Sequence, residues 1–89
     1  MTAKIEIYTK FACGFCYRAK LLLESKGAEY EEIDAMGGPK RDEMLARSNG
    51  QTTVPQIFID GVHVGGSDDL QALDAAGKLD AMLRGATTA

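Results

Sequence analysis

The sequence has few cysteines and histidines and no long apolar run. Its two cysteines and one histidine are too few to supply the four ligands of a structural zinc site. Two cysteines also fall short of the four or more that staple a small secreted domain. No apolar run approaches the ~20 residues of a transmembrane helix, and the first residues contain no apolar stretch typical of a signal peptide. We therefore expect a protein of the reducing cytoplasm, where thiols stay available, without membrane association.

The composition is that of an ordinary globular protein. Of the 89 residues, 45% are hydrophobic and 26% are charged, which suits one folded domain with no room for a second core. We place this domain at residues 1–85 and expect a frayed tail at residues 86–89. The formal net charge of −3 makes a broad surface for nucleic acid unexpected.

Both cysteines lie in one motif, Cys13-Gly14-Phe15-Cys16, which follows an alternating apolar segment and opens a helical one. Positions i and i+3 of a helix lie on the same face, and a disulfide needs Cα atoms about 4.4–6.8 Å apart. The start of a helix also offers free N–H groups and the positive end of its dipole, which favour a thiolate. A structural disulfide over so short a loop would stabilise the fold little. The motif therefore indicates a reversible dithiol/disulfide couple.

The apolar periodicity predicts seven elements in the order β-α-β-α-β-β-α. Strands are expected at residues 4–8, 29–34, 56–59 and 62–64, and helices at residues 15–26, from Gly37-Gly38-Pro39 to residue 48, and from Ser67 onward. The first two strands should be parallel because a helix joins them, whereas Asp60-Gly61 predicts a type I′ hairpin between the last two. Ser67 is the candidate N-cap of the last helix, which Gly77 interrupts before a final turn at residues 79–83.

This order of elements and three separate motifs resemble the glutaredoxin family over nearly the whole chain. The motifs are Cys13-Gly14-Phe15-Cys16, Thr53-Val54-Pro55 and Gly65-Gly66-Ser67-Asp68. The resemblance, which is strongest to short bacterial dithiol glutaredoxins, implies an α/β, thioredoxin-like fold with a four-stranded mixed sheet flanked by helices. One departure is that the family's usual dithiol motif has Pro and Tyr between the cysteines. Gly14 and Phe15 look like the monothiol branch, yet Cys16 is retained, so the motif is a hybrid.

The resemblance implies that Cys13 is the nucleophile and Cys16 the resolving thiol. Lys10, which precedes the motif, is expected to stabilise the Cys13 thiolate or to meet a substrate carboxylate. The alternative for Lys10 is an ordinary solvated lysine. Phe15 is expected to shield the site as an apolar wall, and the alternative is a partly exposed aromatic without a role.

The other two motifs are expected to bind glutathione. The resemblance implies a cis Val54–Pro55 bond, which would hold the backbone N–H and C=O of Val54 beside Cys13 for pairing with an extended peptide such as glutathione. A simple strand-entry proline is the alternative. Thr53 is expected nearby, Arg41 and Arg47 are weaker candidates for the glycyl carboxylate, and His63 is expected to be structural or solvated.

The segment Gly66-Ser67-Asp68 would complete the glutathione site. The N–H groups at a helix start can receive the γ-glutamyl α-carboxylate, while Asp68 can accept from the neighbouring α-ammonium. The two glycines would let ligand and backbone approach closely. Ser67 and Asp68 can also cap and charge the helix, and this structural role is compatible with the binding role.

These expectations together predict a glutathione-dependent thiol–disulfide oxidoreductase. It would reduce protein–glutathione mixed disulfides and protein disulfides through Cys13 and Cys16, as a monomer with glutathione as co-substrate. A first alternative is a carrier dimer that holds a [2Fe–2S] cluster through glutathione and Cys13, which would then be the chain's one metal ligand. A second alternative is a thioredoxin-like reductant served by a flavoprotein reductase, against which the Ser67-Asp68 segment argues.

Overall fold

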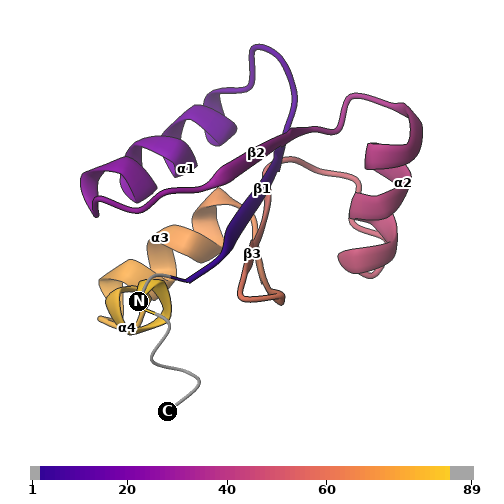
Figure 1. The fold of residues 1–89 in the computed structure, drawn as a ribbon. Coiled ribbons are helices and arrows are strands. Elements are labelled where there is room, and N and C mark those ends of the chain that lie inside the picture. Colours follow the sequence, from indigo (N-terminus) through magenta and orange to yellow (C-terminus); the bar gives the residue numbers. More distant parts are fainter. Residues whose placement is uncertain (1–2, 85–89) are drawn as a thin grey trace.

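A four-stranded mixed sheet with helices on both faces forms the framework of the computed structural model, which describes residues 3–84 (Figure 1). In chain order the elements are β1 (Ile5–Thr9), α1 (Gly14–Ser25), β2 (Glu31–Asp34), α2 (Gly38–Arg47), β3 (Gln56–Ile59), β4 (Val62–Gly65), α3 (Ser67–Ala75) and α4 (Leu79–Leu83). The strand order is β2-β1-β3-β4, with β2 parallel to β1 and with β3 antiparallel to both β1 and β4. The expected fold class is confirmed.

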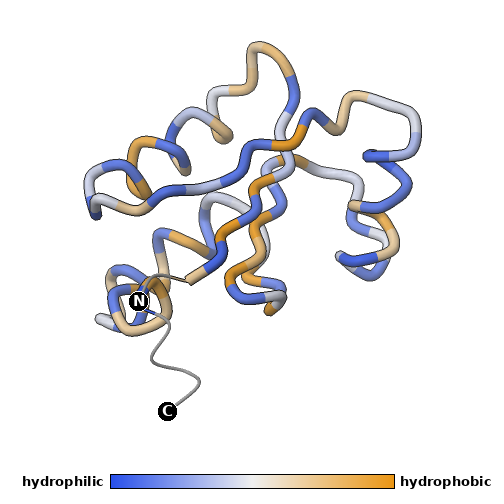
Figure 2. The backbone as a smooth tube through the Cα atoms, viewed as in Figure 1, coloured by the Kyte–Doolittle hydropathy of each residue, from blue (hydrophilic) through white to orange (hydrophobic). Residues whose placement is uncertain are grey.

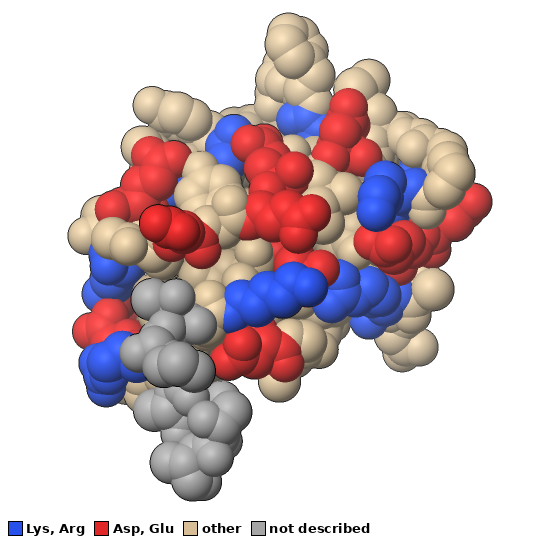
Figure 3. All heavy atoms as spheres, in the orientation of Figure 1, with Lys and Arg blue, Asp and Glu red and all other residues tan. Residues whose placement is uncertain are grey.

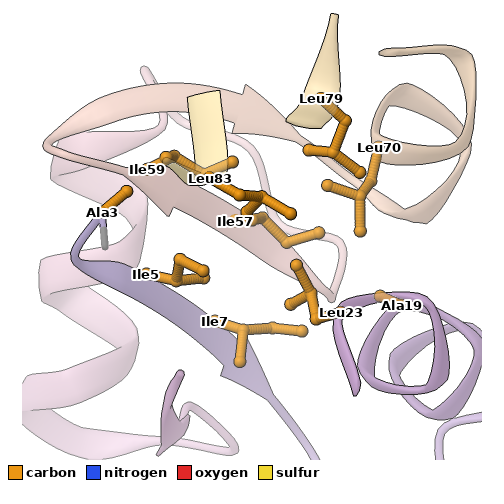
Figure 4. Close-up of a cluster of buried hydrophobic side chains, with 10 residues drawn as sticks. All are labelled: Ala3, Ile5, Ile7, Ala19, Leu23, Ile57, Ile59, Leu70, Leu79 and Leu83. Carbon is orange, nitrogen blue, oxygen red and sulfur yellow. The ribbon is translucent and has the colours of Figure 1, made fainter. Parts of the chain in front are cut away.

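Alternation along the strands gives the sheet two different cores. On one face, isoleucines of β1 and β3 pack against Ala19 and Leu23 of α1 and against leucines of α3 and α4 (Figure 4). On the other face, Tyr8 and Phe58 pack against Met44 of α2. Figure 2 shows the resulting apolar stretches along the strands. Because successive strand residues point to opposite faces, β1 and β3 each contribute to both cores.

The local turn signals of the sequence are realised in the structure. Asp60 and Gly61, with φ values of +50° and +78°, form the two-residue turn between β3 and β4 that a type I′ hairpin requires. Gly27, at φ +70°, ends α1, and its N–H donates to the Glu24 carbonyl at 3.0 Å. Gly77, at φ +74°, separates α3 from α4 as expected.

Two expected element ends differ from the structure, and the expected tail falls outside the described residues. Ser67 is not the N-cap of α3, because Gly66 holds that position and Ser67 is the first helical residue. The strand expected from residue 29 begins at Glu31, since its pairing with β1 begins at that residue, opposite Glu6. The tail expected at residues 86–89 lies outside the described residues.

The surface of the described chain carries both signs of charge. On the face seen in Figure 3, acidic and basic side chains are interspersed, and neither sign covers the whole face. Within residues 3–84, no helix combines the length and the apolar character that crossing a bilayer requires.

Candidate active site

Cys13 lies where the chain turns from β1 into α1. Ala12, directly before it, has a φ of +58°, so the backbone bends sharply just ahead of the thiol. Cys13 is the N-cap of α1, and its Sγ accepts a hydrogen bond from the Cys16 N–H at 3.3 Å. A sulfur atom therefore occupies the place that a serine or aspartate oxygen commonly holds at a helix start.

The surroundings of Cys13 favour its thiolate. Partial burial alone would raise the pKa of this thiol, but the hydrogen bond from the Cys16 thiol opposes that effect. The backbone N–H groups of Cys16 and Phe15 and the positive charge of Lys10 act in the same direction, and together they hold the Cys13 pKa below its usual value. The half-exposed Cys13 is consequently the thiol suited to attack a disulfide.

Cys16 lies one turn further along α1 in a different environment. Its side chain is 2% exposed, and both cysteines are free thiols in this structure. Burial, followed by the hydrogen bond to Cys13 and the charge of its thiolate, raises the pKa of Cys16 to about 12. Cys16 is thus held protonated while Cys13 is ionised, so the two thiols of the motif differ in reactivity.

A groove beside Cys13 brings most of the expected binding residues together. The Val54 carbonyl lies 3.8 Å from the Cys13 Sγ, and the Val54–Pro55 bond is cis, as the resemblance implied. The groove encloses about 310 Å³ and is lined by Phe15, Gln51, Thr53, Val54, Pro55, Gln56, Gly66, Ser67, Asp68 and Asp69. Seven of these residues were expected from the sequence. Segments from three separate parts of the chain therefore meet at one site next to the thiol.

The start of α3 forms the far wall of this groove. The Gly66 N–H donates to Asp69 Oδ2 at 2.9 Å, so Asp69 caps the helix from its first turn. Gly65, at φ +116°, leaves room for this carboxylate, because a Cβ there would lie 2.2 Å from Asp69 Oδ2. Asp68 is exposed, and the buried Ser67 Oγ has no hydrogen-bond partner within residues 3–84. Capping by Asp69 thus leaves Ser67 and Asp68 available to a ligand.

A second groove lies on the Lys10 side of Cys13. It encloses about 770 Å³ and is lined by Thr9, Lys10, Phe11, Ala12, Cys13, Gly14, Cys16, Tyr17, Lys20, Glu32 and Asp34. Phe11 and Tyr17 are 85% and 60% exposed, so large apolar side chains stand open to solvent around the thiol. Lys10 lines this second groove and is absent from the lining of the first.

Comparison with known proteins agrees with this geometry. Residues 5–64 match the family model described as Glutaredoxin. The chain is 58% identical to Glutaredoxin 3 of Escherichia coli strain K12 over 83 residues, 92% of this chain and 99% of that protein.

This chain belongs to the glutaredoxin family.

Two solved glutaredoxins show the same fold. A buckwheat glutaredoxin–glutathione complex is 36% identical with a TM-score of 0.79, and the match covers 91% of this chain and 76% of that one. The holo form of glutaredoxin C1 from Populus tremula x tremuloides is 30% identical with a TM-score of 0.82, covering 99% and 82% of the two chains. Glutaredoxins are thiol oxidoreductases, and the thiol pair at the start of α1 is consistent with that chemistry.

Sequence reasoning missed several residues that line the two grooves of this glutaredoxin. Phe11 and Tyr17 are exposed aromatics that flank the cysteine motif, and their positions beside it are the signal that could have marked them. Gln51, Gln56 and Asp69 line the first groove. For Asp69, its place three residues after Gly66 is the spacing of a capping box, whereas no local pattern distinguishes the two glutamines.

Two arginines and the histidine lie elsewhere in this glutaredoxin. Arg47 forms an ion pair with Glu6 at 3.0 Å and donates to the Tyr8 hydroxyl at 2.8 Å. Neither Arg41 nor Arg47 lines either groove. His63 stacks on Phe58 with ring centroids 4.9 Å apart, in agreement with the structural role expected for it.

Within residues 3–84, no group of three or more His, Cys, Asp or Glu side chains is arranged to hold a metal ion. Cys16 is buried, so one copy of the chain offers a single accessible thiolate, that of Cys13. A [2Fe–2S] cluster is commonly held by four thiolates. One copy of the chain therefore cannot hold such a cluster unaided.

Proposed function

We propose that this glutaredoxin is a glutathione-dependent oxidoreductase that reduces protein–glutathione mixed disulfides and protein disulfides. The observation that carries the proposal is the placement of an activated thiol, Cys13, at the rim of a groove that ends at a free helix start. A reducing cytoplasm, which keeps both thiols free, is the setting in which such a couple would work.

Reduction of a mixed disulfide needs only Cys13. Its thiolate attacks the glutathione sulfur, the protein thiolate leaves and takes a proton from water, and glutathione stays bonded to Cys13. A free glutathione thiolate then attacks the bound glutathione sulfur, so that glutathione disulfide departs and the Cys13 thiolate is restored. The balance consumes one free glutathione thiol, whose sulfur enters glutathione disulfide while the protein sulfur becomes a thiol.

Reduction of a protein disulfide uses Cys16 as well. Attack by Cys13 joins it to one protein sulfur and releases the other as a thiol. The negative charge of Cys13, one cause of the raised Cys16 pKa, disappears in this mixed disulfide. Cys16 can then lose its proton to the departing protein thiolate and attack the Cys13 sulfur, which forms the Cys13–Cys16 disulfide. Two glutathione molecules reduce that disulfide and leave as glutathione disulfide.

The first groove is the proposed glutathione site. The extended tripeptide would pair with the backbone N–H and C=O of Val54, beside Thr53 and Pro55 and next to the wall formed by Phe15. Its γ-glutamyl carboxylate would reach the N–H groups at the start of α3 and the unpartnered Ser67 hydroxyl, near Gly66, while Asp68 would accept from the ammonium. Lys10, on the other side of Cys13, would contribute through its charge to the thiolate.

A second candidate function is that of an iron–sulfur carrier. A Cβ at Gly14 would meet nothing within 4 Å, so space is open at the position between the cysteines where the resemblance to the usual dithiol motif would lead us to expect proline. The cluster would need Cys13 from two copies and thiolates from two glutathione molecules. Visible absorption by anaerobically purified protein would support this candidate, and a colourless dithiol protein would exclude it.

A coupled turnover assay tests the main proposal. The substrate is a glutathionylated peptide, and the reductant is glutathione recycled by glutathione reductase and NADPH. We expect turnover that depends on glutathione and that falls sharply when the peptide carries cysteine instead of glutathione as the disulfide partner. Equal turnover of both peptides, or reduction driven by thioredoxin reductase in place of glutathione, would contradict the proposal.

A further inference from the structure

We propose that His63 and Gln56 are positioning residues that fix the Thr53–Val54 peptide group of the glutathione groove. The inference rests on the proposed function, because it concerns how the Val54 N–H is aimed at the peptide that binds there. Neither residue touches the reacting sulfur atoms in this proposal, so each acts through Thr53 and Val54.

Gln56 connects the sheet to the loop that carries Val54. Its side chain is 1% exposed, and its Nε2 donates to the Thr53 carbonyl at 3.0 Å and to the Thr53 Oγ1 at 3.2 Å. The opposite orientation of the amide would set Oε1 against the Thr53 carbonyl oxygen, so chemistry fixes which end faces the loop. Oε1 therefore faces away from Thr53.

His63 holds that other end of the amide. Its Nε2 lies 2.7 Å from Gln56 Oε1, and because a carbonyl oxygen accepts, Nε2 carries a proton. The imidazole stacks on Phe58 at an interplanar angle of 27°, and Phe58 is itself buried beneath the Arg47 guanidinium, 4.0 Å from its ring centroid. The position of the donor is thus fixed by packing within the sheet.

The geometry of the peptide group transmits this constraint to the groove. The Thr53–Val54 bond is trans, so its C=O and N–H lie in one plane and point in opposite directions. Holding the Thr53 C=O toward Gln56 turns the Val54 N–H the other way. That N–H makes no hydrogen bond to another residue within 3–84, as expected of a group left for a ligand.

Two substitutions at His63 separate the effect of its hydrogen bond to Gln56 from the effect of its ring stacking. His63→Phe keeps an aromatic ring to stack on Phe58 but removes the hydrogen bond, whereas His63→Gln places an amide N–H at about the reach of Nε2. We expect His63→Phe to raise KM for a glutathionylated peptide about three- to tenfold, the effect of one hydrogen bond, with kcat within about twofold. His63→Gln should restore KM to near the wild-type value.

A measurement on the free protein separates this inference from the proposed function. The residual dipolar coupling of the Val54 N–H reports its orientation without any substrate. We expect that coupling to change in His63→Phe and in Gln56→Met, and to match the wild type in His63→Gln. Thermal melts show whether each variant is folded.

An unchanged Val54 coupling in a folded His63→Phe protein would overturn the inference, whatever the kinetics. The same holds if kcat, KM and the rate of attack on 2,2′-dithiodipyridine all worsen together, because that pattern reports general destabilisation. If wild type fails to prefer glutathionylated peptide while the Val54 coupling responds as expected, the proposed function fails and the positioning role stands.

Discussion

The starts of α1 and α3 lie at the same edge of the sheet, and they differ in which side chain accepts a hydrogen bond from the backbone N–H groups there. β1 and β4 are both antiparallel to β3, so the helices that follow them begin at one edge. At α1 the N-cap is Cys13, whose Sγ accepts a hydrogen bond from the Cys16 N–H. At α3 the N-cap is Gly66, whose N–H donates to the Asp69 carboxylate, and the Ser67 Oγ has no hydrogen-bond partner within residues 3–84. One helix start therefore favours a thiolate of the protein, and the other is the one to which we assign the carboxylate of the ligand in the proposed function.

The largest loss of activity is expected when the thiol at the start of α1 is removed. Cys13→Ser should lower turnover of every disulfide substrate by at least about a thousandfold, because serine is not ionised and cannot form the mixed disulfide. Cys16→Ser should keep deglutathionylation within about twofold and lose most reduction of protein disulfides. Turnover of the two substrate types by both variants checks this expectation.

Mass spectrometry provides the control for these variants. After treatment with glutathione disulfide, the Cys16→Ser protein should carry one glutathionyl group, bonded to Cys13. An active Cys13→Ser protein that carries the group on Cys16 would reverse the two roles.

The second effect in size concerns the α3 start. Asp68→Asn should weaken use of glutathionylated substrate by about 10- to 100-fold, the effect of losing a charge-assisted contact of about 1.5–3 kcal/mol. Its melting temperature should stay near that of the wild type, because Asp68 is exposed. Initial rates with glutathionylated peptide and with 2,2′-dithiodipyridine give the comparison.

Asp69→Asn is the matched control, since it changes the neighbouring carboxylate that caps Gly66. Weakening this cap should destabilise the protein by about 0.5–2 kcal/mol and lower its melting temperature. Equal losses on both substrates in Asp68→Asn, together with a lowered melting temperature, would show that Asp68 acts through helix stability alone.

The difference between the two helix starts also shows what sequence could and could not predict. The element order, the hairpin at Asp60-Gly61 and the thiol at the first helix start follow from local patterns, and the structure has all three. The expected N-cap at Ser67 was wrong, because the Gly66 N–H donates to the acid three residues further on and the helix already begins at Ser67. That acid is Asp69, whose carboxylate accepts the hydrogen bond of the N-cap residue, Gly66.

Contacts between distant residues could not be predicted. Arg47 forms a hydrogen bond with Glu6, 41 positions away in the sequence, and such a pairing depends on how α2 packs over the sheet. Likewise, Gln56 reaches His63 only because β3 and β4 form a hairpin in which His63 lies opposite Phe58. The resemblance to glutaredoxins supplied the cis Val54–Pro55 bond, which local propensity alone would have made improbable.

A smaller effect is expected from the charge near the α1 start. Because thiolate is the reactive form, alkylation of Cys13 by iodoacetamide should slow as pH falls through its pKa, which lies below that of an ordinary thiol. Lys10→Met should move this profile to higher pH and slow alkylation at neutral pH by no more than about fivefold, since Lys10 is exposed. Lys10→Arg, which keeps the charge, is the control. A profile unaffected by Lys10→Met would leave the hydrogen bonds at the helix start as the cause of the lowered pKa.

The smallest effect on activity is expected at Gly14, the first residue of α1. Proline there should keep deglutathionylation within about twofold, because a proline ring suits the first helical position and a Cβ meets nothing within 4 Å. Gly14→Ala, which adds the Cβ but keeps the N–H, separates bulk from loss of the donor. If the open space beside Cys13 permits cluster binding, wild type reconstituted with iron, sulfide and glutathione should be coloured and dimeric, and Gly14→Pro much less so. A colourless, monomeric wild type would remove the carrier function and leave the α1 start with thiol chemistry alone.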